Sequence, residues 1–314
     1  MENTERLALF DGNNLLHRAY HAMAQAQLSD ARGRPTGALY GATKALLGYL
    51  RELSPTHMVW FFDHGKSDMR LALREDYKGH RKYSSVVPKA DPQTELPPQI
   101  DAFRELLTLL GIPNVSQRGV EADDLIARAV KVLPWPDQVA ETVIVSSDHD
   151  LLQLVSGNPV VKVYRPGEKP ERTGGSVGLG GLRTPPMGVM YGVPDVISKY
   201  NLPPTKLAEM WALTGDAGDN ISGIHGVGPK TAAKWMNKHG SLPSVLAYES
   251  KCDGMEYHCW VNYQMIQLDG SIGEIDLDLE DCRVLPTLAA GQLSELATKF
   301  CATYGMESLI KEGA

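Results

Sequence analysis

The sequence has few cysteines and no long hydrophobic run. Its four cysteines lie in the last quarter of the 314 residues, without the paired short spacing of a zinc site or the density of a disulfide framework. We therefore expect reduced, mostly buried thiols. The sequence also lacks 18 consecutive apolar residues and a basic start followed by an apolar stretch and a small-residue cleavage site. These absences predict a soluble protein that is not exported. We also expect it to be a cytoplasmic monomer with no membrane partner.

Composition leaves room for a large folded core. A hydrophobic content of 43% is ordinary for a globular protein, and 314 residues suffice for one large or two modest domains. The formal net charge of −7 would by itself argue against a nucleic-acid partner. The position of the acids matters more than their number, however. If nine of them bind metal ions, as argued below, the remaining surface is slightly basic.

Three apolar stretches end in aspartate. Leu7–Phe10, Met58–Phe62 and Thr142–Val145 read as buried strands, and helices over Leu15–Ala26 and Gly37–Leu53 separate the first two. Continuous apolar strands alternating with helices predict a parallel sheet covered on both faces. The carboxyl ends of such strands share one edge, where ligands bind. That edge would receive Asp11, Asp63 and Asp148.

Any single one of these acids has a plainer explanation as a helix N-cap or a turn residue. Acids in the first turn of a helix also complement its dipole, which could account for one or two members of Glu121, Asp123 and Asp124. Convergence of both groups is harder to explain in this way. Glu121 and Asp124 are three residues apart and share a helical face, whereas Asp123 points elsewhere if the first turn is regular.

Crowded carboxylates need a counter-charge. At about 4 Å and an effective dielectric constant of about 20, each like-charged pair costs about 4 kcal/mol. Mg2+ or Mn2+ would bridge such a group, because both bind carboxylate oxygens and require no histidine or cysteine. The candidate metal ligands are Asp11, Asp63, Glu121, Asp123, Asp124, Asp148, Asp150, Asp216 and Asp219.

A basic segment follows the second predicted strand. Between His64 and Ala90 there are seven Lys or Arg and three acids. Their spacing predicts a stripe on one helical face, with Tyr77 and Tyr83 nearby, formed by Arg70, Arg74, Lys78 and Arg81 or Lys82. Such a stripe suits phosphate contact and base stacking, and the alternative is a solvated charged helix. Prolines at 88, 92, 97 and 98 then delay the next helix to Ile100–Leu110.

The C-terminal part is predicted to be helical, over Pro194–Tyr200, Thr205–Thr214 and Thr231–Lys238. Residues 224–230 contain Gly226 and Gly228 before a helix start, which is typical of the hairpin in a helix-hairpin-helix. Pro229 precedes Lys230 and excludes a P-loop. Lys230, Lys234 and Lys238 recur every four residues and favour DNA contact over a plain glycine-rich turn.

These signals divide the chain into three parts. Residues 1–166 would form an α/β core with a central parallel sheet flanked by helices, and residues 64–100 would form an arch on it. Residues 167–185 are rich in glycine and are predicted to be a loop or linker. Residues 186–314 would form an all-helical subdomain, with the helix-hairpin-helix at about 205–240.

Six of these motifs, in order, resemble the 5' nucleases of the flap endonuclease family, which includes the 5' nuclease domain of bacterial DNA polymerase I. They span residues 7 to about 240 and are Phe10-Asp11-Gly-Asn, Phe62-Asp63, Tyr77-Lys78-Gly-His-Arg81, Gly119-Val-Glu121-Ala-Asp123-Asp124, Ser146-Ser-Asp148-His-Asp150-Leu-Leu-Gln-Leu, and Gly215-Asp216-Ala-Gly-Asp219-Asn220-Ile continuing through Gly226-Val-Gly228-Pro-Lys230-Thr-Ala. His149, the glycine-rich loop and the last seventy residues do not match. No polymerase module follows, so we expect a free-standing nuclease.

The resemblance implies a PIN-like fold and a role for each matching residue. The nine acids would hold two or more divalent ions. Tyr77, Lys78 and Arg81 would be catalytic residues at the base of the arch. The hairpin would grip the DNA duplex, commonly with K+. Together with the basic stripe and the lysine spacing described above, it gives the expected DNA-binding residues, which are Arg70, Arg74, Lys82, Gly226, Gly228, Lys230, Thr231 and Lys234.

We therefore expect a metal-dependent 5'-3' exonuclease and flap endonuclease of DNA replication or repair. Its substrates would be 5' ends, flaps and single-strand/duplex junctions. Two alternatives share the acidic sheet edge: an RNA-processing nuclease of the PIN fold, and a junction-binding protein without catalysis. The first would lack the basic arch and the hairpin, and the second would have no use for nine crowded acids.

Overall fold

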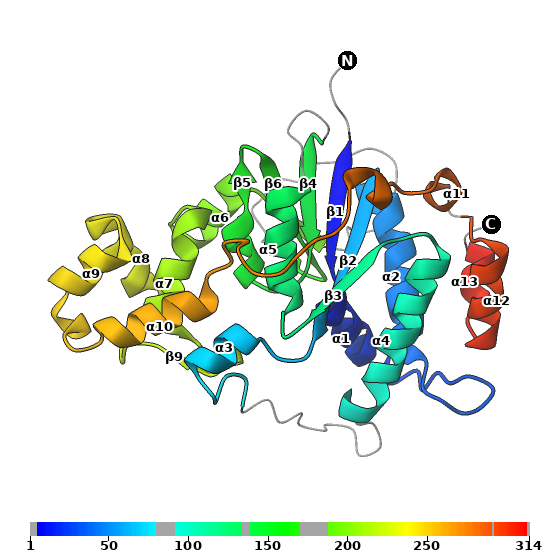
Figure 1. Cartoon of the computed structure of the whole chain (residues 1–314), viewed down its shortest axis with the longest axis horizontal. Helices are drawn as coiled ribbons and strands as arrows, with labels where there is room; N and C mark the ends of the chain where they lie inside the picture. The colour runs from blue at the N-terminus through cyan, green and yellow to red at the C-terminus, as the bar shows by residue number, and fades with distance from the viewer. Residues whose placement is uncertain (1–4, 80–91, 134–138, 170–187, 291, 313–314) are drawn as a thin grey trace.

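A central, mostly parallel sheet organises the molecule, as the computed structural model in Figure 1 shows. The structure describes residues 5–79, 92–133, 139–169, 188–290 and 292–312. The strand order is β3-β2-β1-β4-β6-β5, with β7 antiparallel to β6. The strands are β1 (Arg6–Asp11), β2 (His57–His64), β3 (Asn114–Arg118), β4 (Glu141–Val145), β5 (Ser156–Gly157), β6 (Val160–Pro166) and β7 (Gly188–Tyr191).

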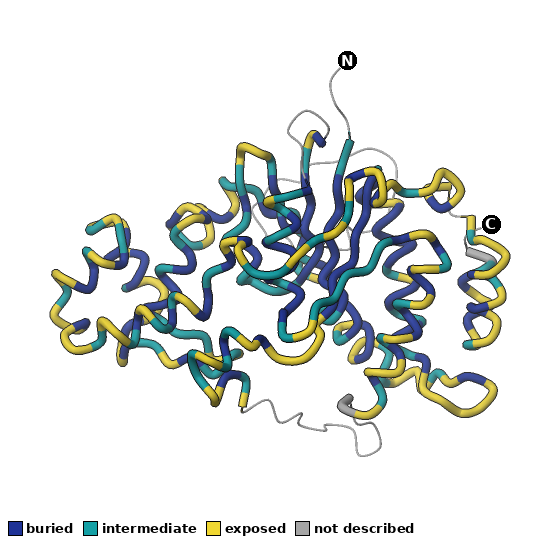
Figure 2. Tube along the Cα trace, in the orientation of Figure 1, coloured by how far each residue is buried: buried dark blue, intermediate teal, exposed yellow. Residues whose placement is uncertain are grey.

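Both faces of the sheet are buried, as its apolar strands predicted. Alternate residues of β1 face opposite layers, because Leu7 and Leu9 join one core cluster and Ala8 and Phe10 join the other. Pairing with β2 is in register, with Phe10 opposite Trp60 and the two rings stacked at a centroid distance of 4.5 Å. Figure 2 shows the central strands β1, β2 and β4 as largely buried and β3 as intermediate.

One face of the sheet is covered by α1 (Gly12–Met23), α2 (Gly37–Leu53) and α4 (Pro92–Leu109). The bounds of α2 agree with the sequence prediction, but α4 begins eight residues before the predicted Ile100. Tertiary contacts outweigh the helix-breaking prolines at 97 and 98: Tyr20 donates to Glu95 over 3.0 Å, and Gln99 accepts from the backbone N–H of Ala38 over 2.8 Å.

The other face carries α5 (Ala122–Val132) and a helical subdomain that extends away from the sheet (Figure 1). This subdomain is helical, as predicted, apart from the short hairpin of β8 (Gly215–Asp216) and β9 (Ile221–Ser222). Its helices are α6 (Val193–Tyr200), α7 (Leu207–Thr214), α8 (Pro229–His239), α9 (Leu242–Tyr248) and α10 (Glu256–Ile266), with 3-10 turns η2 (Pro204–Lys206), η3 (Ala217–Asp219) and η4 (Ser250–Cys252).

The last part of the chain returns to the core, so the prediction that residues 186–314 form one helical subdomain is wrong. It forms η5 (Leu279–Cys282), α11 (Pro286–Ala289), α12 (Glu295–Thr303) and α13 (Glu307–Glu312). Phe300, Cys301 and Leu309 are buried in the layer of α1, α2 and α4. Figure 1 accordingly places α12 and α13 at the opposite end of the molecule from α8 and α9.

Three further expectations concern the whole chain. All four cysteines, which lie in the described part, are buried free thiols, as expected. No helix within the described residues is long and apolar enough to cross a membrane. Most of the predicted linker 167–185 lies outside the described residues, since residues 170–187 are not described.

Candidate metal centre and nucleic-acid interface

The predicted acids from the strand ends lie at one edge of the sheet. Asp11 ends β1 and caps α1, accepting from the backbone N–H of Asn14 over 3.1 Å and from the hydroxyl of Ser146 over 2.7 Å. Burial raises the pKa of Asp11 to about 8, and the negative charges of Asp63 and Asp148 add to that rise. The carboxyl ends of β1, β2 and β4 therefore deliver interacting carboxylates.

The start of α5 contributes a second group. One carboxylate oxygen from each of Glu121, Asp123 and Asp124 lies within 4.8 Å of the others. Asp63 at the end of β2 is joined to this helix, because its Oδ1 accepts from the backbone N–H of Ala122 over 2.8 Å. The pKa of Asp63 is raised to about 6, mainly by desolvation and also by the negative charges of Asp123 and Glu121. The hydrogen bond from Ala122 acts in the opposite direction and lowers this pKa.

A third group gathers beside the 3-10 helix η1 (Asp150–Leu154). Ligand atoms of Asp148, His149 and Asp150 lie within 4.8 Å of one another, and His149 Nε2 is 3.9 Å from Asp216 Oδ2. Asp150 Oδ1 is buried and makes no hydrogen bond. Desolvation, followed by the charges of Asp148 and Asp216, raises the pKa of Asp150 well above its ordinary value.

The loop after β8 completes the arrangement. At Gly215 the backbone has a φ of +72°, and a Cβ there would lie 2.3 Å from the nitrogen of Gly223, so only glycine permits the close turn that positions Asp216. Asp216 Oδ1 accepts from the backbone N–H of Gly218 over 2.7 Å. The charges of Asp123 and Asp219 also act on Asp150, so electrostatic interactions connect all the predicted acids.

Arg70 does not belong to a DNA-binding stripe. The predicted continuous helix is absent from residues 64–79, because α3 spans only Asp68–Leu73. The Arg70 side chain is 2% exposed and lies against α5, with its Nη1 2.5 Å and its Nη2 3.0 Å from the two oxygens of Asp124. Its Nη1 is also 3.2 Å from Glu121, and its Nε donates to Met265 O over 2.7 Å.

Glu121 is the N-cap of α5 and not a residue of the helix itself, but its side chain and that of Asp124 both contact Arg70 and so lie on the same side of α5. Burial alone would lower the pKa of Arg70, but Asp123 and Asp124 outweigh it and raise that pKa. A buried cation thus neutralises part of the acidic cluster. The sequence spacing missed this role because it treated residues 70–82 as one exposed helix.

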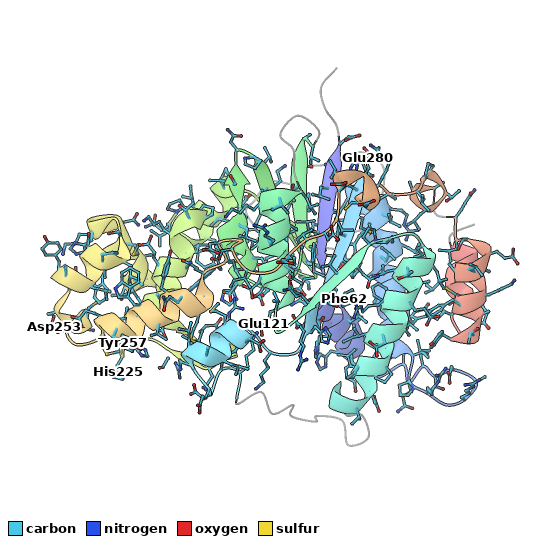
Figure 3. The ribbon with its side chains drawn as sticks, viewed as in Figure 1. Phe62, Glu121, His225, Asp253, Tyr257 and Glu280 are labelled. Atoms are coloured by element: carbon cyan, nitrogen blue, oxygen red, sulfur yellow. The ribbon has the colours of Figure 1, made fainter. Side chains whose placement is uncertain are left out.

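Tyr77 and Lys78 lie against the acids, as their predicted catalytic position requires. The Tyr77 hydroxyl is 2.9 Å from Glu121 Oε2 and 2.8 Å from Asp219 Oδ2, and Lys78 Nζ is 2.9 Å from Glu121 Oε1. Lys78 Nζ is also 3.6 Å from Asp219 Oδ2. Although burial acts to lower it, Glu121 and Asp219 raise the pKa of Lys78, which keeps the side chain charged. Figure 3 shows Glu121 between the sheet and α3.

The segment around Lys78 is fixed from the helical subdomain. Lys78 has a left-handed φ of +52°, and its backbone N–H donates to Asp219 O over 3.2 Å. The Asn220 amide donates to Asp76 O over 3.0 Å. Asn220 lies in one of the motifs described above, but the sequence alone did not predict this contact. Of the other predicted residues, Arg74 pairs with Asp76 and is only partly exposed, and Arg81 and Lys82 lie outside the described residues.

The predicted hairpin forms between β9 and α8. Ile224 and Val227 are buried and anchor it, while Gly226, with a φ of +71°, turns the chain. Gly228 occupies the N-cap position of α8, and Thr231 is half-buried, with its N–H donating to Gly228 O over 3.0 Å. On the helix that follows, the exposed lysines are Lys230, Lys234 and Lys238.

Comparison with known proteins agrees with this geometry. A family described as the N-terminal resolvase-like domain of 5'-3' exonuclease matches residues 6–177. The chain belongs to the 5'-3' exonuclease family. A second description, the C-terminal SAM fold of 5'-3' exonuclease, matches residues 202–288. A 5'-3' exonuclease of Aquifex aeolicus is 31% identical over 312 residues, which are 98% of this chain and 94% of that protein.

Larger relatives contain only a segment that resembles this chain. DNA polymerase I of Mycobacterium tuberculosis is 36% identical over 240 residues, which are 76% of this chain and 24% of that protein, so the chain spans about a quarter of its length.

Solved structures share the fold. The flap endonuclease of bacteriophage T5, crystallised with DNA and metal ions, has a TM-score of 0.64 at 18% identity, covering 98% of this chain and 100% of that one. A flap endonuclease from Methanococcus jannaschii has a TM-score of 0.53 at 17% identity, covering 100% of this chain and 95% of that one.

Proposed function

We propose that this protein is a structure-specific 5' nuclease that hydrolyses DNA phosphodiesters near 5' ends, flaps and single-strand/duplex junctions. The observation that carries the proposal is the gathering of acids from β1, β2, β4, α5 and the β8–β9 loop beside Lys78. Family membership supports the same activity. Such a nuclease acts in DNA replication or repair and belongs in the cytoplasm of a bacterium or of a phage-infected bacterial cell.

The acidic cluster fits divalent ions. The buried Asp150 Oδ1 has no hydrogen-bond partner, and the raised pKa values of Asp11, Asp63 and Asp150 show carboxylates under mutual repulsion and desolvation. An all-oxygen set of this kind suits Mg2+ or Mn2+. We assign two or more ions to Asp11, Asp63, Glu121, Asp123, Asp148, Asp150, Asp216 and Asp219, with Asp124 acting through its pair with Arg70.

The chain's own residues prepare the phosphate for attack. When bound, the ions supply Lewis-acid stabilisation and promote ionisation of the attacking water. Lys78 provides a positive charge held between Glu121 and Asp219, which is placed to offset charge that grows on the phosphate. Tyr77 fixes the same two carboxylates through its hydroxyl, and we propose that Arg81 assists Lys78.

Duplex DNA would be held by the hairpin. The N-terminus of α8 would direct the positive end of its helix dipole at a phosphate, and K+ bound near Gly226 and Gly228 would assist. Lys230 and Lys234 are exposed on the same helix and would contact the backbone of the duplex. Each should contribute about one unit to the slope of log affinity against log salt, so a lysine-to-alanine change lowers that slope by about one. We propose that a monomer suffices.

End-labelled flap, nicked and blunt DNA, each incubated with and without Mg2+, tests the proposal. We expect Mg2+-dependent products released from the 5' side, with flapped substrates cut near the junction. A matched RNA substrate separates DNA from RNA cleavage. Absence of Mg2+-dependent cleavage on every DNA substrate, or faster cleavage of RNA, would contradict the proposed function.

A further inference from the structure

His149 is the one side chain in the third acidic group that is not a carboxylate. In the sequence it lies between two aspartates, and in the structure its imidazole nitrogens lie within 4 Å of the carboxylates of three aspartates. Its Nε2 is 3.4 Å from Asp150 Oδ1 and 3.9 Å from Asp216 Oδ2, and its Nδ1 is 3.7 Å from Asp148 Oδ1. The function proposed above gives this residue no role.

These separations match a shared coordination sphere. For ligand atoms about 2.1 Å from an octahedral ion, neighbouring ligands lie about 3.0 Å apart and opposite ligands about 4.2 Å apart. The distances from His149 Nε2 to Asp150 Oδ1 and Asp216 Oδ2 fall within that interval. The spacing from His149 Nε2 to each of these two oxygens is therefore compatible with binding to one ion.

The imidazole ring of His149 also packs against an aromatic side chain. Trp211 of α7, which is 5% exposed, makes an edge contact with the imidazole at a centroid distance of 5.0 Å and an interplanar angle of 86°. Asp150 Oδ1, the nearest oxygen to Nε2, is the buried atom without a hydrogen bond. The imidazole nitrogen and the orphaned oxygen thus approach the same point, where neither hydrogen-bonds the other.

We propose that His149 Nε2 is a nitrogen ligand of the ion held by Asp150 and Asp216. This inference rests on the proposed metal centre and concerns which ion that part of it prefers. Imidazole nitrogen binds first-row transition ions, of which Mn2+ is the weakest binder, whereas Mg2+ takes oxygen ligands. One site of the centre is therefore a mixed nitrogen and oxygen site that selects Mn2+ over Mg2+.

Electron spin echo envelope modulation of the Mn2+-loaded full chain tests the ligand directly. We expect 14N modulation in the native protein, a changed pattern after selective 15N labelling of histidine, and loss of the modulation in His149→Asn. His64→Asn is the matched control, because His64 is an exposed histidine that follows another candidate ligand, Asp63. That control should keep the modulation.

Calorimetric titration with each ion alone gives a second measure that does not depend on nuclease activity. His149→Asn should weaken Mn2+ binding at one site on the order of tenfold, with a much smaller change for Mg2+. Circular dichroism checks that the variant is folded. Native protein that binds Mn2+ without 14N modulation, or unchanged Mn2+ affinity in the variant, would overturn the role of His149 alone. A failure to bind either ion would overturn the proposed metal centre as well.

Discussion

At the scale of single residues, Asp150 carries a buried carboxylate oxygen that would be stabilised by a cation. Its Oδ1 is buried without a hydrogen bond, and Asp148 and Asp216 oppose its ionisation. Lys78 is on the other side of the cluster, where Glu121 and Asp219 hold its charge. We therefore propose separable functions for the two residues, metal binding for Asp150 and charge stabilisation for Lys78.

Asp150→Asn should reduce Mg2+-dependent flap cleavage by at least about 100-fold, because an amide is a poor ligand and carries no charge. DNA binding in Ca2+ should survive, since the hairpin is untouched. Cleavage rates and gel shifts measure the two properties. Asp253→Asn, an exposed acid at the far end of the helical subdomain (Figure 3), is the control. Retained cleavage in Asp150→Asn would refute its assignment as a ligand.

Lys78→Ala should slow turnover by about 100-fold while duplex affinity changes by less than about threefold. The reason is that its ammonium lies among the acids rather than on the exposed hairpin surface. Single-turnover rates and equilibrium binding separate the two effects. Lys66→Ala removes an exposed lysine from the same segment as a control. Equal losses of turnover rate and duplex affinity would contradict a catalytic role for Lys78.

At the scale of elements, the short helix α3 joins parts of the molecule that are distant in sequence. Arg70 connects α3 to Asp124 on α5 and to the carbonyl of Met265 on α10. The loop after α3 then docks on Asp219 and Asn220. These contacts set where Lys78 lies relative to the acids.

Arg70→Ala should lower the free energy of unfolding by about 3–5 kcal/mol, because it leaves buried carboxylates without their partner. Denaturant titration measures the change. Arg74→Ala removes a more exposed pair with Asp76 and should lower it by less than about 1 kcal/mol. The opposite result would be an Arg70→Ala protein with unchanged stability and a weaker salt dependence of DNA binding. That result would contradict the buried role of Arg70 and support a contact between Arg70 and a DNA phosphate.

The elements that sequence predicted well are those with regular hydrophobic patterns. The apolar runs of β1, β2 and β4 predicted these strands correctly. They also predicted that Asp11 and Asp63 lie at the carboxyl ends of β1 and β2. The prediction of a basic stripe through Arg70 was wrong because charge spacing does not reveal burial. The predicted start of α4 was too late because contacts with α1 and α2 outweigh the local effect of the prolines. β3 was missed because its residues are only partly buried and not apolar enough to stand out.

At the scale of the whole molecule, burial of like charges couples stability to pH. Asp11 has its folded-state pKa raised to about 8 from 3.8, so the folded protein holds this proton more tightly than the unfolded chain. The stability that Asp11 contributes is complete below 3.8 and is lost as the pH rises through about 8. Bound divalent ions would cancel this effect by compensating the charge.

Metal-free protein should therefore lose about 2 kcal/mol of unfolding free energy between pH 6.5 and 8.5. Denaturant titrations in chelator and in saturating Mg2+ measure it, and the loss should be much smaller in Mg2+. Asp11→Asn keeps the N-cap acceptor but cannot titrate, so its loss of unfolding free energy over this interval should be smaller than that of the native protein by about 2 kcal/mol. The same slope in native protein and variant would show that other groups cause it.

The most direct test of the account is the anomalous scattering of Mn2+ in crystals of the native protein. We expect anomalous peaks within the acidic cluster, in contact with carboxylates of Asp148 and Asp150 and beside Glu121. A structure with Mn2+ in the crystal and no peak at these carboxylates would contradict the central claim that they form a divalent metal centre.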